Sequence, residues 1–548
     1  MAVLDEQPTD SRDGERAVDF DVVVVGAGFA GLYALHVLRE HGFTARAYEK
    51  GDGIGGTWFW NRYPGARVDI QSCEYMFTKF SDIEQEWDWT ELMPAQEEIE
   101  RYLNFMADRL DLRKDVQLET AVTAMTFDEV SSTWTVALAT GEQVRSSFVV
   151  AATGCLSAPL EPAIEGLHDF AGDTMFTNRF PKEGYDFTGK RVAVVGTGSS
   201  GVQSIPVIAE QAEQLYVLQR SAAYTIPSPN RVLNEGELAA LKAEYPEIRK
   251  AQWASPIGSA RFGAVFQGME LPNILDTPWE EQIQRVDMLG VIAAFVWGDT
   301  RTDVEANDAA RKLYAEAVKR VVNDPKTAED LVPPYPLGCK RVIIDQGYYP
   351  TFNRDNVQLV NLRRTPIARV VPSGIELADG TVLELDAIVY ATGFDAMTGA
   401  LSRIDVRGRD GRRLGAEWAE APKAYLGVAV EGFPNLFTIT GPGSPSVLTN
   451  MVTSIEHHVE WVTTLLDEMR TSGQRTVEAD ATAQDEWADH VTAQAGPIVV
   501  HESCNSWYLG ANVPGKTRSY MPYSAGLDVY MVRCAEIAAD GYVGLTRT

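Results

Sequence analysis

Cysteine, positive charge and long apolar runs are all scarce in this chain of 548 residues. The five cysteines form no Cys-x-x-Cys pair, so the sequence predicts neither a disulfide framework nor a zinc site. The formal charge of −29 argues against nucleic acid or an anionic membrane as a partner. No apolar run is long enough to cross a bilayer. These shortages favour a protein of the reducing cytoplasm.

The amino-terminal stretch has no apolar core. Residues 1–19 are rich in acidic and small polar side chains, so we expect a disordered tail there, and neither a signal peptide nor a membrane helix. The rest of the chain exceeds the size at which one hydrophobic core stops growing. Two or three domains are therefore expected.

A glycine-rich turn follows the first apolar run, Val22–Val25, and its glycines are Gly26, Gly28 and Gly31. Such glycines permit a tight turn from strand to helix, let a pyrophosphate approach the helix N-terminus, and allow close packing of helix on strand. The next predicted strand ends at Glu49, whose carboxylate can accept a hydrogen bond from a ribose hydroxyl. The pattern predicts an adenine dinucleotide site suited to FAD.

The same turn recurs further along the chain at Gly196, Gly198 and Gly201. At the position of the earlier acid lies Gln219, followed by Arg220 and Ser221. An acid there would repel a 2′-phosphate, whereas Arg220 can pair with one, so this second site should prefer NADPH to NADH. A solvated arginine at a strand end is the alternative interpretation.

Together these patterns predict an α/β fold with two Rossmann-like dinucleotide-binding domains, for FAD and NADP, and a helical insertion. A turn at Gly380 leading to Gly393 repeats the spacing from Gly141 to Gly154, which supports the pairing of two similar units. We expect the FAD-binding domain at residues 20–157 and 388–548, the NADP-binding domain at 158–224 and 334–387, and the helical insert at 225–333.

Two such sites in one chain predict hydride transfer from a nicotinamide to a flavin. The reduced flavin could then reduce a disulfide, pass electrons to another carrier, or hold oxygen as a C4a-peroxide. A disulfide reductase would need a redox-active cysteine pair, which the sequence does not provide.

The segment from Gly55 to Asp69 reads GGTWFWNRYPGARVD. It meets every fixed position of the pattern (A/G)GxWxxxx(F/Y)P(G/M)xxxD, and so resembles the active-site fingerprint of the flavin-dependent Baeyer–Villiger monooxygenases, closest to their phenylacetone monooxygenase branch. The resemblance extends over nearly the whole chain after the tail. It includes GTGSSG, the Lys340-Arg341 pair, ATGFD, GPGSPS and the segment from Trp507 to Lys516.

This resemblance implies an enzyme that uses NADPH and O2 to convert a hydrophobic aryl or cyclic ketone into an ester or lactone through a flavin C4a-peroxide. It implies that Arg341 supplies a persistent positive charge and that Asp69 orients it. Lys340 should lie beside the NADP 2′-phosphate, and Trp507 should contact NADP. Further cofactor-binding residues by resemblance are Gly56, Thr57, Trp58, Asp69, Ser199 and Asp395. The implied substrate pocket comprises Leu156, Ser446, Val447, Leu448 and Met521.

The family's second signature, FxGxxxHxxxW, is only partly kept, because Phe176 replaces its histidine and Phe180 its tryptophan. These replacements could alter domain motion, or two aromatic rings could simply repack the position. Phe180 also moves the motif toward flavin enzymes that oxidise nitrogen or sulfur, whereas Asp69 and Arg341 favour ketone oxidation. An N- or S-oxygenase, an uncoupled NADPH oxidase and a catalytically silent nucleotide-binding protein are the alternatives. Expected partners are a small ketone and O2, without nucleic acid or membrane, and the chain should be a monomer or weak oligomer.

Overall fold

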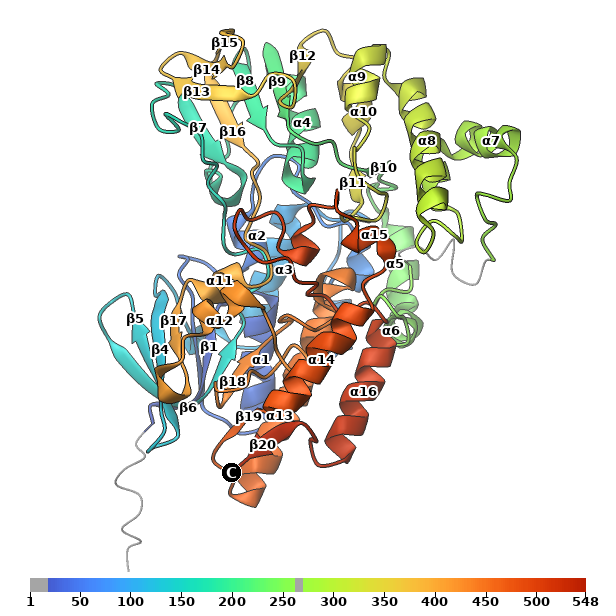
Figure 1. Ribbon diagram of the computed structural model, residues 1–548. Coiled ribbons are helices and arrows are strands. Elements are labelled where there is room, and N and C mark those ends of the chain that lie inside the picture. Colours follow the sequence, from blue (N-terminus) through green and yellow to red (C-terminus); the bar gives the residue numbers. More distant parts are fainter. Residues whose placement is uncertain (1–17, 262–269) are drawn as a thin grey trace, which may run out of the picture.

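The computed structural model describes residues 18–261 and 270–548 (Figure 1). The predicted disordered tail, residues 1–19, lies almost wholly outside the described residues. Two sheets containing parallel strands, one below the other in Figure 1, form the framework, and helices pack around both. The predicted α/β fold with two Rossmann-like units is confirmed.

The first sheet has eight strands: β1 (Phe20–Val25), β2 (Ala45–Tyr48), β3 (Val116–Gln117), β4 (Val122–Asp128), β5 (Thr133–Leu138), β6 (Gln143–Ala151), β17 (Asp405–Arg407) and β18 (Leu436–Thr438). Their order is β17-β4-β5-β6-β1-β2-β3, with β18 also paired to β6. Strand β1 is parallel to both of its neighbours, and its four valines are buried. Burial on both faces explains why this strand is a continuous apolar run.

The second sheet has five strands: β7 (Asp173–Phe176), β8 (Arg191–Val195), β9 (Gln214–Gln219), β12 (Val357–Asn361) and β16 (Ala387–Tyr390). All are parallel, in the order β12-β9-β8-β16-β7. The carboxyl ends of parallel strands meet at one edge of a sheet. Residues that follow β8, β9 and β12 therefore gather at that edge.

Three smaller sheets complete the strands. They are β10 (Thr225–Pro227) with β11 (Ile343–Asp345), β13 (Ile367–Val371) with β14 (Gly374–Leu377) and β15 (Val382–Glu384), and β19 (Val477–Ala479) with β20 (Leu545–Arg547). The turn between β14 and β15 contains Gly380 at φ +86°, and Gly141 at φ +89° occupies the turn before β6. The two units therefore share the repeated turn that the sequence indicates.

The described helices are α1 (Phe29–Glu40), α2 (Thr57–Trp60), α3 (Gln96–Arg109), α4 (Ser199–Gln211), α5 (Glu235–Ala243), α6 (Tyr245–Trp253), α7 (Trp279–Leu289), α8 (Val304–Val321), α9 (Pro325–Asp330), α10 (Tyr348–Thr351), α11 (Gly399–Ser402), α12 (Leu414–Glu420), α13 (Met451–Ser472), α14 (Ala481–Ala493), α15 (Pro497–Val500) and α16 (Leu527–Ala539). The stretch that the sequence predicts to be helical carries α5 to α9. The fingerprint segment from Gly55 to Asp69 contains the single turn of α2, in which Trp58 and Phe59 are buried.

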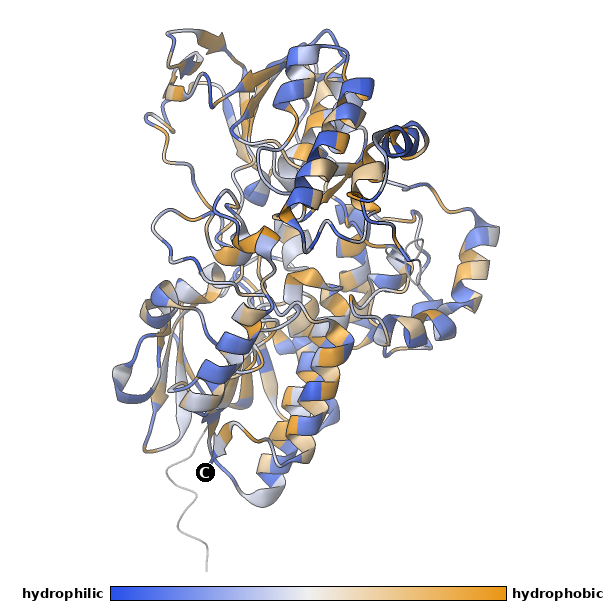
Figure 2. Cartoon of the chain, turned by 45° about the vertical axis from the view of Figure 1, so that its right-hand side comes forward, coloured by the Kyte–Doolittle hydropathy of each residue, from blue (hydrophilic) through white to orange (hydrophobic). Residues whose placement is uncertain are grey.

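Apolar residues line the strands and the inward faces of helices, while hydrophilic colour dominates the outer helices and loops (Figure 2). The longest helix, α13, packs against α1 and buries residues such as Val459, Leu465 and Leu466. Across residues 18–261 and 270–548, no helix combines the length and the hydrophobicity that crossing a membrane requires.

Cys339 and Cys504 form a disulfide with their Cα atoms 5.6 Å apart. The prediction that the chain lacks such a bond is therefore wrong. The two residues are separated by 165 positions, and only folding brings them together, so no spacing rule could reveal the pair. Cys73, Cys155 and Cys534 are free.

Candidate active site

The first glycine turn is closed by backbone contacts that leave no room for side chains. A Cβ atom on Gly26 would lie 2.7 Å from the Ala152 carbonyl oxygen, and one on Gly31 would lie 2.0 Å from the Gly26 carbonyl oxygen. Gly28 faces Gly56 across the turn, where an added Cβ would meet the Gly56 Cα at 3.2 Å. No side chain caps the start of α1. Its first N–H groups therefore fit an anionic pyrophosphate.

Glu49 is 5% exposed, and its carboxylate holds the same turn. It accepts hydrogen bonds from the backbone N–H groups of Ala27 at 3.0 Å and Gly51 at 2.9 Å. The structure shows that this acid links the glycine turn at Ala27 to the loop at Gly51, and its contact with a ribose stays a prediction.

The second glycine turn has the same construction. A Cβ atom on Gly196 would lie 2.5 Å from the Ala391 carbonyl oxygen, and one on Gly201 would lie 2.1 Å from the Gly196 carbonyl oxygen. Beside Gly198, however, there is no atom within 4 Å of the added Cβ, and no side chain caps α4. This open cradle, with Ser199 at the first position of the helix, fits a second dinucleotide.

Three cations gather at the edge of the second sheet. Burial, together with the charges of Arg220 and Arg363, lowers the pKa of Lys340 to about 8. Arg363 also donates to the Ser221 hydroxyl at 3.4 Å. None of the three cations has a carboxylate within 4.0 Å in the part of the chain that the structure describes. Such unneutralised cations fit a 2′-phosphate.

Sequence reasoning missed Arg363. It lies two residues after β12, whose last residue Asn361 is in register with Gln219 at the end of β9. The sequence shows a cation shortly after a strand, but it does not show that this strand, β12, lies next to β9 in the sheet.

The predicted pair of Arg341 and Asp69 is formed across 272 positions of the chain. The Nε of Arg341 donates to Oδ2 of Asp69 at 2.8 Å, and Nη2 lies 2.7 Å from the same oxygen. The third contact, from Nη1 to the carbonyl oxygen of Val447 at 2.9 Å, could not be read from the sequence. The charge of Asp69 raises the pKa of Arg341 above its usual value, so the guanidinium keeps its proton.

The aromatic surroundings of this pair are Trp58, Tyr75 and Tyr508. The Trp58 indole donates to the Tyr75 hydroxyl at 3.2 Å. Burial raises the pKa of Tyr508 to about 12, although the charge of Arg341 opposes that shift. Both phenols remain neutral near pH 7. The structure thus surrounds Arg341 with neutral side chains and one carboxylate, Asp69.

Four of the five predicted pocket residues belong to one extended hydrophobic core, which also includes residues of β1, α1 and α13. Val447 and Met521 are buried in it, and Leu156 and Leu448 pack against it. Ser446 is fully buried and adopts φ +40°, a strained conformation for a residue with a side chain. That conformation begins the short helix Ser446–Leu448, from which Val447 presents its carbonyl to Arg341.

The segment from Trp507 to Lys516 lies over this region from the carboxy-terminal part of the chain. Trp507 begins a short helix, Trp507–Leu509. Lys516 Nζ donates to Asp395 Oδ1 at 2.6 Å and to the Thr398 hydroxyl at 2.7 Å. Asp395, predicted as a cofactor residue, therefore anchors this segment in the structure.

The two phenylalanines of the altered second signature are packing residues in this structure. Phe176 is 5% exposed, stacks on Tyr390 with ring centroids 5.0 Å apart, and receives the Arg179 guanidinium 4.1 Å from its ring centroid. Phe180 is buried beside Phe187. These contacts favour the interpretation that aromatic rings repack the position.

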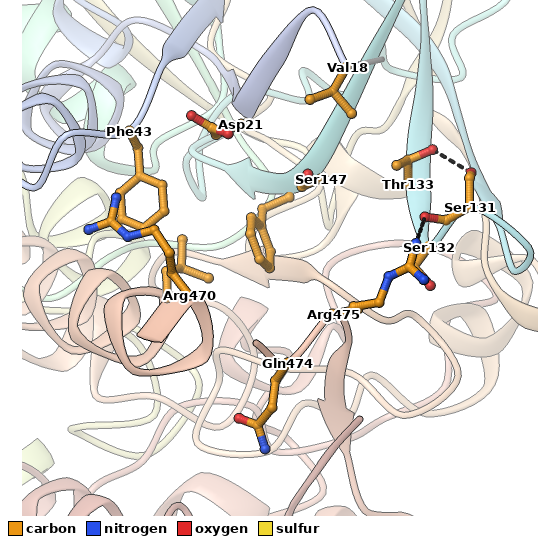
Figure 3. Close-up of a pocket in the computed structure, with 12 residues that line it drawn as sticks. Val18, Asp21, Phe43, Ser131, Ser132, Thr133, Ser147, Arg470, Gln474 and Arg475 are labelled. Carbon is orange, nitrogen blue, oxygen red and sulfur yellow. Dashed lines mark hydrogen bonds between the residues drawn. The ribbon is translucent and has the colours of Figure 1, made fainter. Parts of the chain in front are cut away.

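A pocket of about 150 Å³ opens elsewhere, near the start of β1 (Figure 3). Its lining includes Val18, Asp21, Phe43, Arg470 and Arg475. None of the predicted site residues lines it, so it plays no part in the argument for the active site.

Comparison with known proteins agrees with this geometry. The profile of the family described as flavin-binding monooxygenase-like matches residues 20–239. The chain is 39% identical to the acetone monooxygenase (methyl acetate-forming) of Gordonia sp. (strain TY-5), covering 96% of this chain and 98% of that one. It is 37% identical to a Baeyer–Villiger monooxygenase of Pseudooceanicola batsensis, covering 96% of both. The chain belongs to the Baeyer–Villiger monooxygenases.

The solved OTEMO complex with FAD and NADP is also similar to this enzyme, with a TM-score of 0.90 and 36% identity over 97% of this chain and 100% of that one. The predicted family and the two predicted cofactors, FAD and NADP, are confirmed. The protein is an FAD-dependent monooxygenase that uses NADPH and O2. Its assignment to the phenylacetone monooxygenase branch stays a prediction.

Proposed function

We propose that this Baeyer–Villiger monooxygenase oxidises a hydrophobic aryl or cyclic ketone to an ester or lactone. The observation that carries the proposal is the Arg341–Asp69 pair beside Val447, since it places a fixed cation next to a buried apolar residue. Attack on a ketone carbon develops negative charge on its oxygen, which a preorganised guanidinium stabilises. The name of the acetone monooxygenase relative supports a ketone as the substrate class.

We assign the following roles within this site. Bound FAD supplies the hydride acceptor and the oxygen-activating chemistry. Arg341 stabilises the negative charge that develops on oxygen during the reaction, and Asp69 holds the Arg341 side chain in its orientation. The FAD would be held by Gly26, Gly28, Gly31, Glu49, Gly56, Thr57 and Trp58. The NADP would be held by Gly196, Gly198, Ser199, Gly201, Arg220, Ser221, Lys340, Asp395 and Trp507.

The substrate pocket is proposed to consist of Leu156, Ser446, Val447, Leu448 and Met521. Apart from the Ser446 hydroxyl, these side chains are apolar, which supports a hydrophobic ketone. An N- or S-oxygenase is less well supported, because a soft nucleophile needs a protonated oxidant and no arginine clamp. The observed arginine is instead held in place by two partners, Asp69 and the Val447 carbonyl.

Adding phenylacetone or cyclohexanone should speed NADPH oxidation and yield ester or lactone, because a ketone diverts the activated oxygen away from peroxide release. The measurement follows NADPH absorbance, hydrogen peroxide and product in the same sample. NADPH oxidation that stays the same across a ketone panel, with all oxygen recovered as peroxide, would show that the enzyme is an oxidase.

The domain boundaries at residues 157, 224, 333 and 387 remain part of this proposal, as do a monomeric or weakly oligomeric state and a cytoplasmic location. The charge of −29 supports the absence of nucleic acid as a partner.

A further inference from the structure

Gln203 lies in the second turn of α4 and reaches across to the fingerprint segment, which we define as residues 55–69. Its Nε2 donates to the Arg67 carbonyl oxygen at 3.1 Å, and the Tyr63 hydroxyl donates to its Oε1 at 2.8 Å. Gly65, at φ +78°, packs directly on the same turn of α4, where an added Cβ would lie 2.4 Å from the Gln203 carbonyl oxygen. The two segments are therefore held together by two side-chain hydrogen bonds and a close backbone contact.

This contact connects the two halves of the site. Gln203 is 7% exposed, so removing its amide would leave its partners without hydrogen bonds in a dry environment. Burial raises the pKa of Tyr63 to about 12, which keeps its hydroxyl protonated as a donor. The helix that carries Gln203 begins at Ser199, directly after Gly198 of the second glycine turn, and Arg67 is two residues from Asp69.

We propose that Gln203 is a positioning residue that fixes the NADP-binding helix α4 against the segment carrying Asp69, and thereby sets where Arg341 stands relative to the nicotinamide nucleotide. This inference rests on the roles proposed for Asp69 and Arg341. The proposed role requires both the oxygen and the nitrogen of the Gln203 side-chain amide, because the oxygen binds the Tyr63 hydroxyl and the nitrogen binds the Arg67 backbone.

Gln203→Leu should weaken NADP⁺ binding about 10-fold, the size expected when buried hydrogen-bond partners are left unpaired. It should also raise the peroxide released per NADPH at unchanged FAD content, and it should lower the melting temperature, because the unpaired partners remain buried. Gln203→Glu keeps the acceptor for Tyr63 and should recover part of both losses. Gln211→Leu is the matched control, since Gln211 lies on the same helix but accepts from Phe187.

Tyr63→Phe provides a second test. Combined with Gln203→Leu it should add little, because the two side chains share one hydrogen bond. Full additivity, or the same losses in Gln211→Leu, would overturn the proposal. Binding of NADP⁺ is measured by calorimetry without turnover, so this test can fail or succeed whether or not a ketone is oxidised.

A second inference comes from the Cys339–Cys504 disulfide. Cys339 directly precedes Lys340 and Arg341, whereas Cys504 begins the carboxy-terminal strap, which we define as residues 504–518. Both cysteines are fully buried in one hydrophobic cluster. The disulfide thus joins the segment of the proposed catalytic arginine to the strap that carries Trp507.

The other contacts that hold the strap are non-covalent. Lys516 pairs with Asp395 at 2.6 Å, and the Asn512 amide donates to the Phe394 carbonyl oxygen at 2.8 Å. The Arg518 guanidinium donates to the Cys504 carbonyl oxygen at 3.1 Å within the strap itself. Loss of the disulfide would leave the first part of the strap without its covalent attachment.

We infer that this disulfide is a redox-sensitive cross-link that keeps the strap closed over the active site. Two thiols and one hydrogen peroxide give the disulfide and two waters, the sulfurs losing two electrons and the peroxide gaining them. A small dithiol reverses the bond by exchange and becomes oxidised itself. Because both sulfurs are buried, a dithiol can reach them only after the strap has moved away from the protein. Bound NADP⁺ should therefore slow the reduction of this disulfide. The inference rests on the role proposed for Trp507.

Thiol titration of the denatured enzyme should find three free cysteines after peroxide and five after a dithiol. Cys504→Ser and the reduced enzyme should both be cleaved several-fold faster by chymotrypsin within the strap, and both should release more peroxide per NADPH. Cys534→Ala, which removes a free buried cysteine on α16, is the matched control. Five thiols after peroxide, or equal cleavage rates for reduced and oxidised enzyme, would overturn the inference.

Discussion

Replacing Arg341 with alanine should lower ketone oxygenation by about 100- to 1000-fold, the loss typical of removing one preorganised donor to an oxyanion. Reduction of the flavin by NADPH should be unaffected, because hydride transfer does not require a cation at this position. The lost contacts are those to Asp69 at 2.8 Å and to the Val447 carbonyl at 2.9 Å. Anaerobic stopped-flow reduction and product yield in air measure the two steps separately.

Asp69→Asn should give a smaller loss, since the amide keeps the shape of the carboxylate but not its charge. Arg409→Ala is the matched control. Its side chain is 31% exposed and lies 2.7 Å from Glu478, close to the 33% and 2.7 Å of Arg341 with Asp69, but it follows β17, the edge strand of the first sheet. Ester formation at the normal rate in Arg341→Ala would show that the charge has been assigned to the wrong residue.

The double substitution of Arg220 and Lys340 by alanine should lower the preference for NADPH over NADH by about 100-fold or more. Each charge-assisted hydrogen bond to a phosphate contributes ~1.5–3 kcal/mol, and NADH lacks that phosphate. The measurement is the ratio of kcat/KM for the two nucleotides. Lys190→Ala, which removes a cation next to the amino end of β8, should leave the ratio unchanged. An unchanged ratio in the double variant would show that other residues bind the 2′-phosphate.

The same cluster predicts a pH dependence. In the free enzyme the pKa of Lys340 lies at about 8, so the ammonium is present below that pH and is lost above it. A bound phosphate favours the charged form. The KM for NADPH should therefore rise as the pH increases above 8, while the KM for NADH should not follow. Lys340→Arg should remove the rise, because a guanidinium does not lose its proton in this range.

Much of the framework could be predicted because it depends on neighbouring residues. The valines of β1 and the glycines at 26, 28 and 31 specify a buried strand and a tight turn through local sterics, and the structure has both. The same holds for the second turn at Gly196 and for the helices α5 to α9.

Only some residues of the functional site could be predicted from the sequence. Asp69 and Arg341 could be named through a family resemblance, and the structure brings them within 2.8 Å, although their catalytic roles stay predictions. Arg363, the Val447 carbonyl and Gln203 were not found from the sequence. Each acts through a contact with a segment distant in the chain, and no local pattern encodes such a contact.

By itself the sequence determined the two dinucleotide turns, the replacement of the second acid by Gln219 and Arg220, and the fingerprint that ends at Asp69. These features are set by residue type and short-range spacing. Only the tertiary structure decided that Cys339 pairs with Cys504, that Arg220, Lys340 and Arg363 converge, and that α4 is held against the fingerprint segment by Gln203. The reason is physical: distances between remote side chains are fixed by how sheets and helices pack, and that packing is a property of the whole chain.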